Sequence, residues 1–597
     1  MTLVKIVNKK ISLISKATKL LWESSPQNFF VLCILSIAMS LPEVAGMWVW
    51  KEILNFISLS LTGSEPMIEQ ICFYIFLHLC LKIIASLLNK LNTYNSNILK
   101  IMVDKEINKK YFNVVNGLLP QDIEVAEIRD KLEMIERDAG ERTLGILMKM
   151  VELFQSISLL IFTSSVLAVI DFKIILVVLL SIIPISIAYK RTYKDIFIVY
   201  SERLEKLRYV KALRDTVHQN GFVMENMIYK VINYVETKSE ELINEIIKSE
   251  KKLKKRVFIR EALVENISMM LTYVVKLMLI ILGISDNNNL GSIVMSISAF
   301  DKINNSILNV SMISNSLYDD GLYLKAINDL EEYAKKNSSN ESRKQIINEV
   351  NKISFKNVFF RYQNSKSYSL KNISLNFEKG KSYAIVGKNG SGKSTLVKLI
   401  LGMYSPLNGE ITIDGISMCD YNRYSLYDKS SVLFQEFMKY PLSFYENIRF
   451  KDRDKDEDIL FDKACELVKL NDLIQELPEK EDQLLTKGWK DSIDLSGGQW
   501  QKVAIARFFA KDGLLRILDE PGASLDAKSE SEILKNIIND KFSISIVVTH
   551  RFQNIKKYDE IIVMKDGEIE SKGNHAYLMK NSAVYRDLYI AQKEMME

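Results

Sequence analysis

The 597-residue sequence is poor in cysteine, carries little net charge and shows no cleavable signal peptide. The cysteines are scattered and none forms a CxxC pair, so neither a disulfide framework nor a cysteine-based metal site is expected. The net charge of +5 is too small to indicate a nucleic-acid-binding protein. No short apolar run with a small-residue cleavage site follows closely on the basic N-terminal segment, which excludes a secretory signal. Solenoid repeats and low-complexity tracts are also missing from the sequence.

Long apolar runs stand beside a polar remainder. Hydrophobic residues make up 48% of the chain although 26% of it is charged, which indicates an oily part and a soluble part in a chain too long for one domain. Several runs are long enough to span a bilayer, namely residues 29–50, 68–88, 144–170, 172–189, 262–283 and 290–309. One such run can be a buried helix of a soluble protein, but five or six cannot. The last run is the most polar and is typical of a helix that faces a water-filled cavity.

Basic residues between these runs orient the predicted spans. The loops after the second and fourth runs are long and rich in lysine and arginine, whereas the other connections are short and nearly free of both. The positive-inside rule then places both termini and both long loops in the cytoplasm, and the spans in the cytoplasmic membrane among its lipids. Both long loops have helical periodicity, so we expect the spans to continue as helices into the cytosol. Residues 248–256 are best interpreted as a solvated helix face near lipid headgroups, with a specific lipid site as the alternative.

The composition changes near residue 331. Residues 331–343 are polar with clustered serine and asparagine, which is typical of a linker. Short β-rich runs then alternate with helical patterns, which predicts an α/β nucleotide-binding domain. The expected strands are residues 353–362, 382–386, 431–434, 514–518, 544–549 and 561–565. We therefore predict a membrane α-helical domain of six transmembrane helices at 1–330, a linker at 331–350 and an α/β P-loop domain at 351–597.

Residues 385–395, IVGKNGSGKST, fit the phosphate-loop pattern G-x-x-x-x-G-K-[ST]. An apolar run before them and a helical run after them supply the strand–loop–helix context that the pattern requires. The glycines let the backbone point several N–H groups at one phosphate cluster, and the helix N-terminus adds its positive dipole end. The expected nucleotide-binding residues are Gly387, Lys388, Asn389, Gly390, Ser391, Gly392, Lys393, Ser394 and Thr395. Lys393 would reach the β and γ phosphates, and Ser394 would ligate Mg²⁺.

Further residues with suitable chemistry follow downstream. The sequence LSGGQ opens another predicted helix, where small residues offer a second anion contact: Ser496, Gly497, Gly498 and Gln499. A strand ends in Asp519, which would hold Mg²⁺ through water, and in Glu520, which would act as general base on the attacking water. His550 closes another strand and could contact the γ-phosphate, and Gln435 follows a strand where its amide could touch metal and water. Each of these is usually structural when it occurs alone, but together with the phosphate loop they predict hydrolysis of ATP with Mg²⁺.

These motifs, with ILDEP at residues 517–521 and SLD at residues 524–526, resemble the ATPase of ABC transporters. The predicted spans and long cytoplasmic loops resemble a half-transporter of the exporter type. The resemblance implies that two chains pair head to tail, so that each ATP lies between residues 387–394 of one chain and residues 496–498 of the other. We expect a homodimer, because one chain carries both halves of a composite site; a heterodimer with a different half-transporter is the alternative.

The resemblance also implies roles for other residues. Tyr362 would stack on adenine, and Asp526 would contribute to nucleotide binding. Residues 119–128 and 221–229 fall where coupling helices dock onto the ATPase.

Some positions depart from the family pattern. Arg516 interrupts an apolar strand, which indicates either a strand near an edge or a paired arginine. Gly522 stands where threonine is common, and residues 486–494 do not match the usual TEVGERG loop. Trp500 and residues 434–448 resemble bacterial peptide and lantibiotic exporters more than drug pumps. No cysteine-peptidase domain precedes the first span, so leader cleavage is expected to happen elsewhere.

Charges within the predicted spans bear on the cargo. They are expected either to line a wet cavity that suits an amphipathic peptide, or to lie near helix ends and snorkel. The candidates for the cavity are Glu43, Glu152, Glu265, Lys276 and Asp301, and those for snorkelling are Lys82, Lys149 and Lys302. We predict ATP-driven export of a small peptide by alternating access. The alternatives are an exporter or flippase of amphiphilic drugs or lipids, a membrane ABC ATPase that moves nothing, and an importer of the same fold.

Overall fold

The computed structural model describes residues 15, 18–61, 68–170, 203, 206–217, 223–285, 289–363, 365–453, 458–520, 527–552 and 554–594. The chain divides into two compact units. The first unit comprises Met1–Asn116 and Ala126–Glu332, and the second comprises Gly117–Val125 and Tyr333–Glu597.

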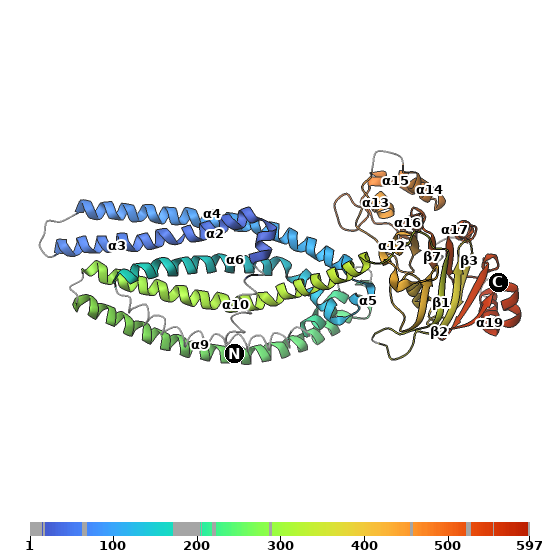
Figure 1. Cartoon of the computed structure of the whole chain (residues 1–597), viewed down its shortest axis with the longest axis horizontal. Coiled ribbons are helices and arrows are strands. Elements are labelled where there is room, and N and C mark those ends of the chain that lie inside the picture. The colour runs from blue at the N-terminus through green and yellow to red at the C-terminus, as the bar shows by residue number, and fades with distance from the viewer. Residues whose placement is uncertain are drawn as a thin grey trace. The chain divides into compact units, whose positions relative to one another are not determined.

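Long helices build the first unit (Figure 1). Its described helices are α2 (Pro26–Ala38), α3 (Ser40–Leu61), α4 (Ile68–Gly117), α6 (Ala126–Ile170), α8 (Val223–Ile228), α9 (Val231–Ser285) and most of α10 (Leu290–Ser342). Ser25 caps α2 by accepting a hydrogen bond from the Asn28 backbone N–H, and Pro26 occupies the first turn, where no N–H partner is needed. With 50 residues, α4 is about 75 Å long, far more than the roughly 30 Å of a bilayer core. The expected helical continuation of this span beyond the membrane is confirmed for α4.

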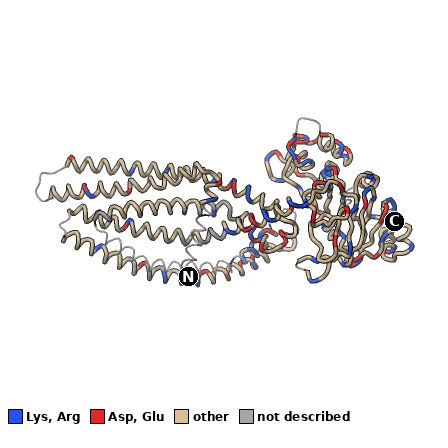
Figure 2. Tube along the Cα trace, viewed as in Figure 1, with Lys and Arg blue, Asp and Glu red and all other residues tan. Residues whose placement is uncertain are grey.

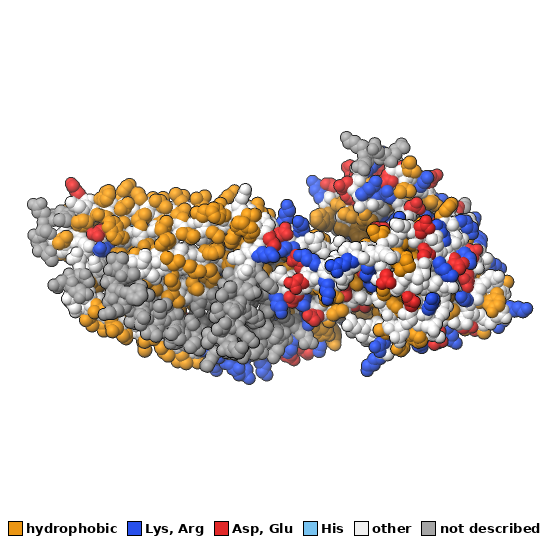
Figure 3. Space-filling view, in the orientation of Figure 1, with side chains coloured by type: hydrophobic (Ala, Val, Ile, Leu, Met, Phe, Trp, Pro, Cys, Tyr) orange, Lys and Arg blue, Asp and Glu red, His pale blue; other side chains and the backbone are white. Residues whose placement is uncertain are grey.

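Within the described residues, four stretches are long and apolar enough to cross a membrane: Pro26–Leu61, Ile68–Gly117, Gly145–Val166 and Val231–Ser285. Three of them contain predicted spans, at residues 29–50, 68–88 and 262–283, and Gly145–Val166 lies within the predicted span at residues 144–170. The predicted span at residues 290–309 opens α10 and is not among the four, and the one at residues 172–189 lies outside the described residues. Apolar side chains cover most of the coloured surface of the helices (Figure 3), while charged residues are sparse along them and gather toward one end (Figure 2). Such an apolar surface is stable in lipid and not in water.

Ion pairs join charged side chains of the predicted spans. The Lys276 ammonium lies 2.7 Å from an Asp301 carboxylate oxygen, and Lys302 pairs with Glu43. Pairing lowers the cost of holding charge at membrane depth. Two other predicted cavity residues, Glu152 and Glu265, have exposed side chains.

Two sheets form the centre of the second unit. The first is antiparallel in the order β2-β1-β4-β5, with β1 (Lys352–Phe360), β2 (Leu370–Glu378), β4 (Asn408–Ile413) and β5 (Ile416–Ser417). The second has the order β10-β9-β3-β8-β7-β6, with β3 (Ser382–Gly387), β6 (Ser430–Leu433), β7 (Leu515–Asp519), β8 (Ile544–Val548), β9 (Glu560–Lys565) and β10 (Glu568–Gly573). All its pairings are parallel except that of β10 with β9. The predicted α/β fold and its predicted strands are thus confirmed.

Helices surround this mainly parallel sheet (Figure 1). They are α11 (Lys393–Ile400), α12 (Arg423–Asp428), α13 (Phe444–Arg449), α14 (Ile459–Leu467), α15 (Asn471–Glu476), α16 (Gly497–Phe509), α17 (Ala527–Ile538), α18 (His575–Asn581) and α19 (Ala583–Glu594). Of these, α13, α14 and α15 form a group to one side of the sheet. Every residue of β3 and β8 is buried, because both faces of the sheet carry a hydrophobic core. Along β3, Ala384 and Val386 join one core, and Tyr383 and Ile385 join the other. A continuous apolar run is therefore what the central strands require.

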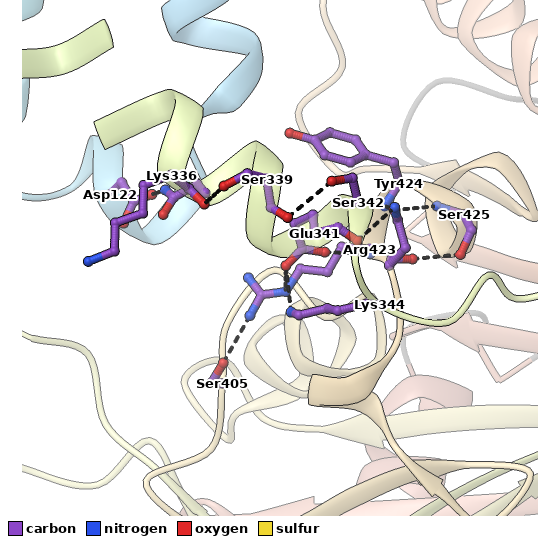
Figure 4. Close-up of polar contacts among 12 residues, drawn as sticks. Asp122, Lys336, Ser339, Glu341, Ser342, Lys344, Ser405, Arg423, Tyr424 and Ser425 are labelled. Atoms are coloured by element: carbon purple, nitrogen blue, oxygen red, sulfur yellow. Dashed lines mark hydrogen bonds and ion pairs between the residues drawn. The ribbon is translucent and has the colours of Figure 1, made fainter. Parts of the chain in front are cut away.

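The C-terminal end of α10 belongs to the second unit and is tied to it by a buried carboxylate. Glu341 is 5% exposed, accepts a hydrogen bond from the Arg423 backbone N–H at 2.8 Å and pairs with Lys344 at 2.6 Å (Figure 4). The Arg423 guanidinium lies 4.0 Å from the same carboxylate and donates to the Ser405 hydroxyl at 3.1 Å. The first part of the predicted linker is therefore helix as far as Ser342, and it is anchored at its end.

Candidate functional site

The phosphate loop joins β3 to α11. Gly390 and Gly392 have φ of +78° and +101°, and Gly392 is the residue before the first turn of α11. A Cβ at Gly387 would lie 2.4 Å from the Met564 carbonyl oxygen, so only glycine fits there. The loop therefore turns tightly enough to expose its backbone N–H groups at the N-terminus of α11, as the sequence predicts.

The Lys393 ammonium is folded back against the loop. It donates hydrogen bonds to the carbonyl oxygens of Gly387 at 3.0 Å and Lys388 at 3.1 Å, and the side chain is buried. Burial lowers the pKa of Lys393 from its ordinary value, while the carboxylates of Glu520 and Asp519 act in the opposite direction. A cation held at this position can compensate the charge of a polyphosphate.

Two carboxylates end β7 beside the loop. Asp519 is buried, and its Oδ1 atom has no hydrogen-bond partner. Burial, and then the neighbouring Glu520, raise the pKa of Asp519. An unpartnered buried carboxylate oxygen is one that a water molecule on Mg²⁺ would satisfy, so this residue fits the predicted metal role.

The Glu520 side chain contacts two other predicted site residues. Glu520 adopts φ of +52°, a left-handed conformation that is uncommon outside glycine and occurs at functional sites. Its carboxylate accepts a hydrogen bond from Gln435 Nε2 at 3.0 Å, and His550 Nε2 lies 2.8 Å from Oε1. Burial, and then Lys393, lower the pKa of His550, while Glu520 raises it. The net direction is downward, which favours the neutral imidazole.

A cavity of about 730 Å³ brings most of these residues together, although Gly387, Lys388, Ser391 and Asp519 do not line it. Predicted residues that line it are Asn389, Gly390, Gly392, Lys393, Ser394, Thr395, Gln435, Glu520 and His550. Other lining residues were not predicted, namely Ser367, Tyr368, Ser369, Asp566 and Gly567. They come from the β1–β2 and β9–β10 connections, which carry no motif. The turn signal Asp566-Gly567 is visible in the sequence, but nothing in it indicates which site the turn approaches.

Tyr362 lies beside this cavity and is not among the residues that line it. Its hydroxyl is 3.3 Å from the Thr395 hydroxyl, and its ring packs edge-on against Phe360 and Tyr404. The Lys398 ammonium lies 5.4 Å from the centre of the Tyr362 ring. An adenine contact by Tyr362 stays a prediction.

The LSGGQ residues open α16 away from the cavity. Ser496 caps the helix in a reciprocal pair: its backbone N–H donates to Gln499 Oε1 at 2.8 Å, and its hydroxyl accepts from the Gln499 N–H at 3.3 Å. Ser496 and Gly497 are exposed, and a Cβ on Gly497 would meet nothing within 4 Å. Neither residue, nor Gly498, lines the cavity that holds the phosphate loop. Within one chain, LSGGQ and the phosphate loop therefore do not share that cavity.

Contacts account for two of the unusual residues, Arg516 and Trp500. The predicted alternatives for Arg516 are a strand near an edge or a paired arginine. Arg516 is paired, because its guanidinium lies 3.3 Å from Asp540 and 3.5 Å from Asp512. Trp500 is buried in the core and donates from Nε1 to Asp494 at 3.1 Å, which ties α16 to the segment before it. Gly522 and Asp526 lie outside the described residues.

One of the two predicted docking segments contacts the ATPase core. Residues 120–123 form the short helix α5 (Pro120–Ile123), and Glu124 accepts a hydrogen bond from the Tyr404 hydroxyl. Asp122 is buried and accepts from the Tyr333 hydroxyl at 2.8 Å and from Asn337 at 3.1 Å. The other segment forms α8, whose apolar side chains Met224, Met227 and Ile228 are exposed.

Comparison with known proteins agrees with this geometry. Residues 370–523, which include the phosphate loop, LSGGQ and both carboxylates, match the family model described as ABC transporter. The chain carries an ABC transporter ATPase domain fused to a membrane domain. It binds nucleotide through this domain and hydrolyses ATP in a cycle coupled to transport.

Relatives cover different shares of the transporter. The subtilin transport ATP-binding protein SpaT of Bacillus subtilis is 26% identical over 96% of this chain and 93% of its own length. The nisin transport ATP-binding protein NisT of Lactococcus lactis subsp. lactis is 28% identical over 96% and 95%. The ATP-dependent lipid A-core flippase of Haemophilus influenzae is 33% identical, over only 40% of each chain.

A solved structure shares the fold of the transporter. A bacterial Atm1-family ABC exporter with ATP bound superposes with a TM-score of 0.69 at 19% identity, over 96% of this chain and 98% of that one. This likeness extends through the helical unit. The long apolar helices and the transport relatives that match the whole chain indicate a membrane-integral protein.

Proposed function

We propose that two copies of this chain form an exporter of a small peptide in the cytoplasmic membrane, driven by ATP hydrolysis. The observation that carries the cargo class is the extent of the similarity. The two lantibiotic transport proteins resemble this chain over 96% of its length, so they share its membrane helices, which contact the cargo. The lipid A-core flippase resembles it over only 40%, a share that the ATPase domain alone can supply.

The proposed assembly is a homodimer with two equivalent nucleotide sites. The phosphate-loop cavity lacks LSGGQ within one chain, and Ser496 and Gly497 are exposed on another part of the surface. A second copy would supply these residues to each cavity and close it over the nucleotide. The membrane domain is assigned to residues 1–330, the linker to 331–350 and the ATPase domain to 351–597, with both termini in the cytoplasm.

In the proposed mechanism, the loop N–H groups and the Lys393 ammonium hold the phosphates, and Tyr362 contacts the base. Ser394, Asp519 and Gln435 would hold Mg²⁺, which would supply charge compensation at the phosphates. Glu520 takes the proton of the attacking water, and neutral His550, 2.8 Å from it, orients the carboxylate and contacts the γ-phosphate. Asp526 contributes from the segment after β7.

Transport into inside-out vesicles tests this function. The purified full-length chain is reconstituted with ATP and Mg²⁺, and uptake of a fluorescent lantibiotic precursor peptide is compared with movement of a fluorescent lipid A analogue. We expect ATP-dependent peptide uptake and peptide-stimulated phosphate release, both abolished in Glu520→Gln. Movement of the lipid without the peptide would contradict the proposed cargo. ATP-dependent movement of neither, with unstimulated ATPase, would contradict export of both classes.

A further inference from the structure

The C-terminal helix α19 contacts the segment that carries His550, and α18 packs against α19. His550 follows β8 and precedes Phe552, a buried residue at the start of the next connection. The Phe552 backbone N–H donates a hydrogen bond to Gln592 Oε1 on α19 at 3.0 Å. This bond joins Phe552 to a residue 40 positions later, and Phe552 lies two positions after the predicted catalytic residue His550.

Aromatic contacts reinforce this junction. The Phe552 ring packs edge-on against Tyr585, with 5.6 Å between ring centres, and against Tyr589, with 5.9 Å. Tyr585 is fully buried, and its hydroxyl lies 2.8 Å from His575 Nδ1. The His575 ring in turn lies 5.0 Å from the Tyr589 ring. We call these residues the C-terminal cluster: Phe552, His575, Tyr585, Tyr589 and Gln592. Edge-on aromatic contacts of this kind add stability beyond the burial of apolar area.

The other side of His550 is fixed by the central sheet. The Thr549 backbone N–H donates to the Ile385 carbonyl oxygen of β3 at 3.2 Å, and the Thr549 hydroxyl accepts from the Arg551 N–H at 2.9 Å. The short segment with His550 is therefore held at Thr549 by the sheet and at Phe552 by the C-terminal cluster. A group that must lie within hydrogen-bond distance of a reacting phosphate needs its backbone fixed on both sides.

We propose that Gln592 and Tyr589 of α19 are positioning residues for ATP hydrolysis, acting through His550. The inference rests on the proposed role of His550 in that reaction. In Gln592→Ala, the Phe552 N–H loses its acceptor and the His550 backbone becomes less well fixed, while the phosphate loop that binds ATP is untouched. The expected result is a three- to tenfold lower kcat, about the net worth of one hydrogen bond, with unchanged KM for ATP.

Variants of Gln592 separate positioning from general stability. Gln592→Glu keeps an oxygen acceptor for the Phe552 N–H and is expected to restore kcat. Asn581→Ala removes an amide from α18 that bonds only the Tyr577 carbonyl oxygen in its own helix, and it is expected to leave kcat unchanged. A role in stability alone would lower the melting temperature in Gln592→Ala without a selective loss of kcat, and that outcome would overturn the inference.

A double variant shows whether Gln592 acts through His550. In single-turnover measurements on the full-length protein with ATP and Mg²⁺, Gln592→Ala is expected to cause no further loss when His550 is already alanine, because residues acting as one unit are not additive. A full additional loss in the double variant would overturn the inference. A normal rate in His550→Ala alone would instead overturn the proposed role of His550, and the inference with it.

Discussion

Replacing Glu520 by glutamine tests the chemistry of the site most sharply. The side chain keeps its size, and its remaining carbonyl oxygen can still accept from Gln435 Nε2, which now lies 3.0 Å from the carboxylate. What is lost is the proton acceptor beside His550. A positioned general base contributes about 10²–10⁴-fold in rate, which corresponds to about 2.7–5.4 kcal/mol of activation free energy. We expect phosphate release to fall by this factor.

Nucleotide binding should survive the same substitution. Glu520 is not part of the phosphate loop. Its negative charge helps to raise the pKa of Asp519, so the substitution should bring that pKa closer to its ordinary value. The assay therefore pairs phosphate release with binding of a fluorescent ATP analogue by the same preparation. Glu568→Gln, at an exposed position on β10, is the matched control and should behave like the unmodified protein. Near-normal phosphate release from Glu520→Gln would refute the assignment of the base.

Other predictions follow from the same contacts. Lys393→Ala should weaken binding of the ATP analogue or slow turnover, because the buried ammonium that compensates phosphate charge is lost; normal binding and turnover together would contradict its role. Burial and Lys393 lower the pKa of His550 below its ordinary value of about 6.5, so the loss of hydrolysis on acidification, measured as phosphate release, should have its midpoint below about pH 6.5; a midpoint above pH 7 would contradict the lowered pKa. Glu341→Ala leaves the buried Arg423 without its carboxylate, which costs about 3–5 kcal/mol, so the melting temperature of the full-length protein should fall; an unchanged melting temperature would show that water replaces the pair.

Much of the ATPase domain could be predicted because its constraints are local. The phosphate loop needs glycine where φ is positive, as at Gly390 and Gly392, and such positions are visible in a sequence. The strands β3 and β8 are buried on both faces, so they appear as continuous apolar runs. Strand β10 was missed because half of its residues are exposed and its sequence, EIESKG, has no apolar run.

What could not be predicted depends on contacts between distant residues. The serine and asparagine cluster near residue 340 favours a linker, yet α10 continues to Ser342 because Glu341 is anchored by Arg423, 82 residues away. Lys276 pairs with Asp301, a residue of another helix. No local sequence pattern indicates whether a charged residue in a span will find such a partner. The bond from Phe552 to Gln592 likewise joins two segments without any motif.

Mixed dimers give the most direct test of the central claim that two chains share each ATP site. Lys393→Ala damages the phosphate loop, and Ser496→Arg blocks LSGGQ. A dimer of one Lys393→Ala chain with one Ser496→Arg chain keeps one intact composite site, whereas a dimer of an unmodified chain with a chain carrying both substitutions keeps none. With differently tagged chains purified as mixed dimers, the account predicts that the first dimer hydrolyses ATP and the second does not. Equal rates, or a faster second dimer, would contradict it, because a site contained within one chain would survive only in the second arrangement.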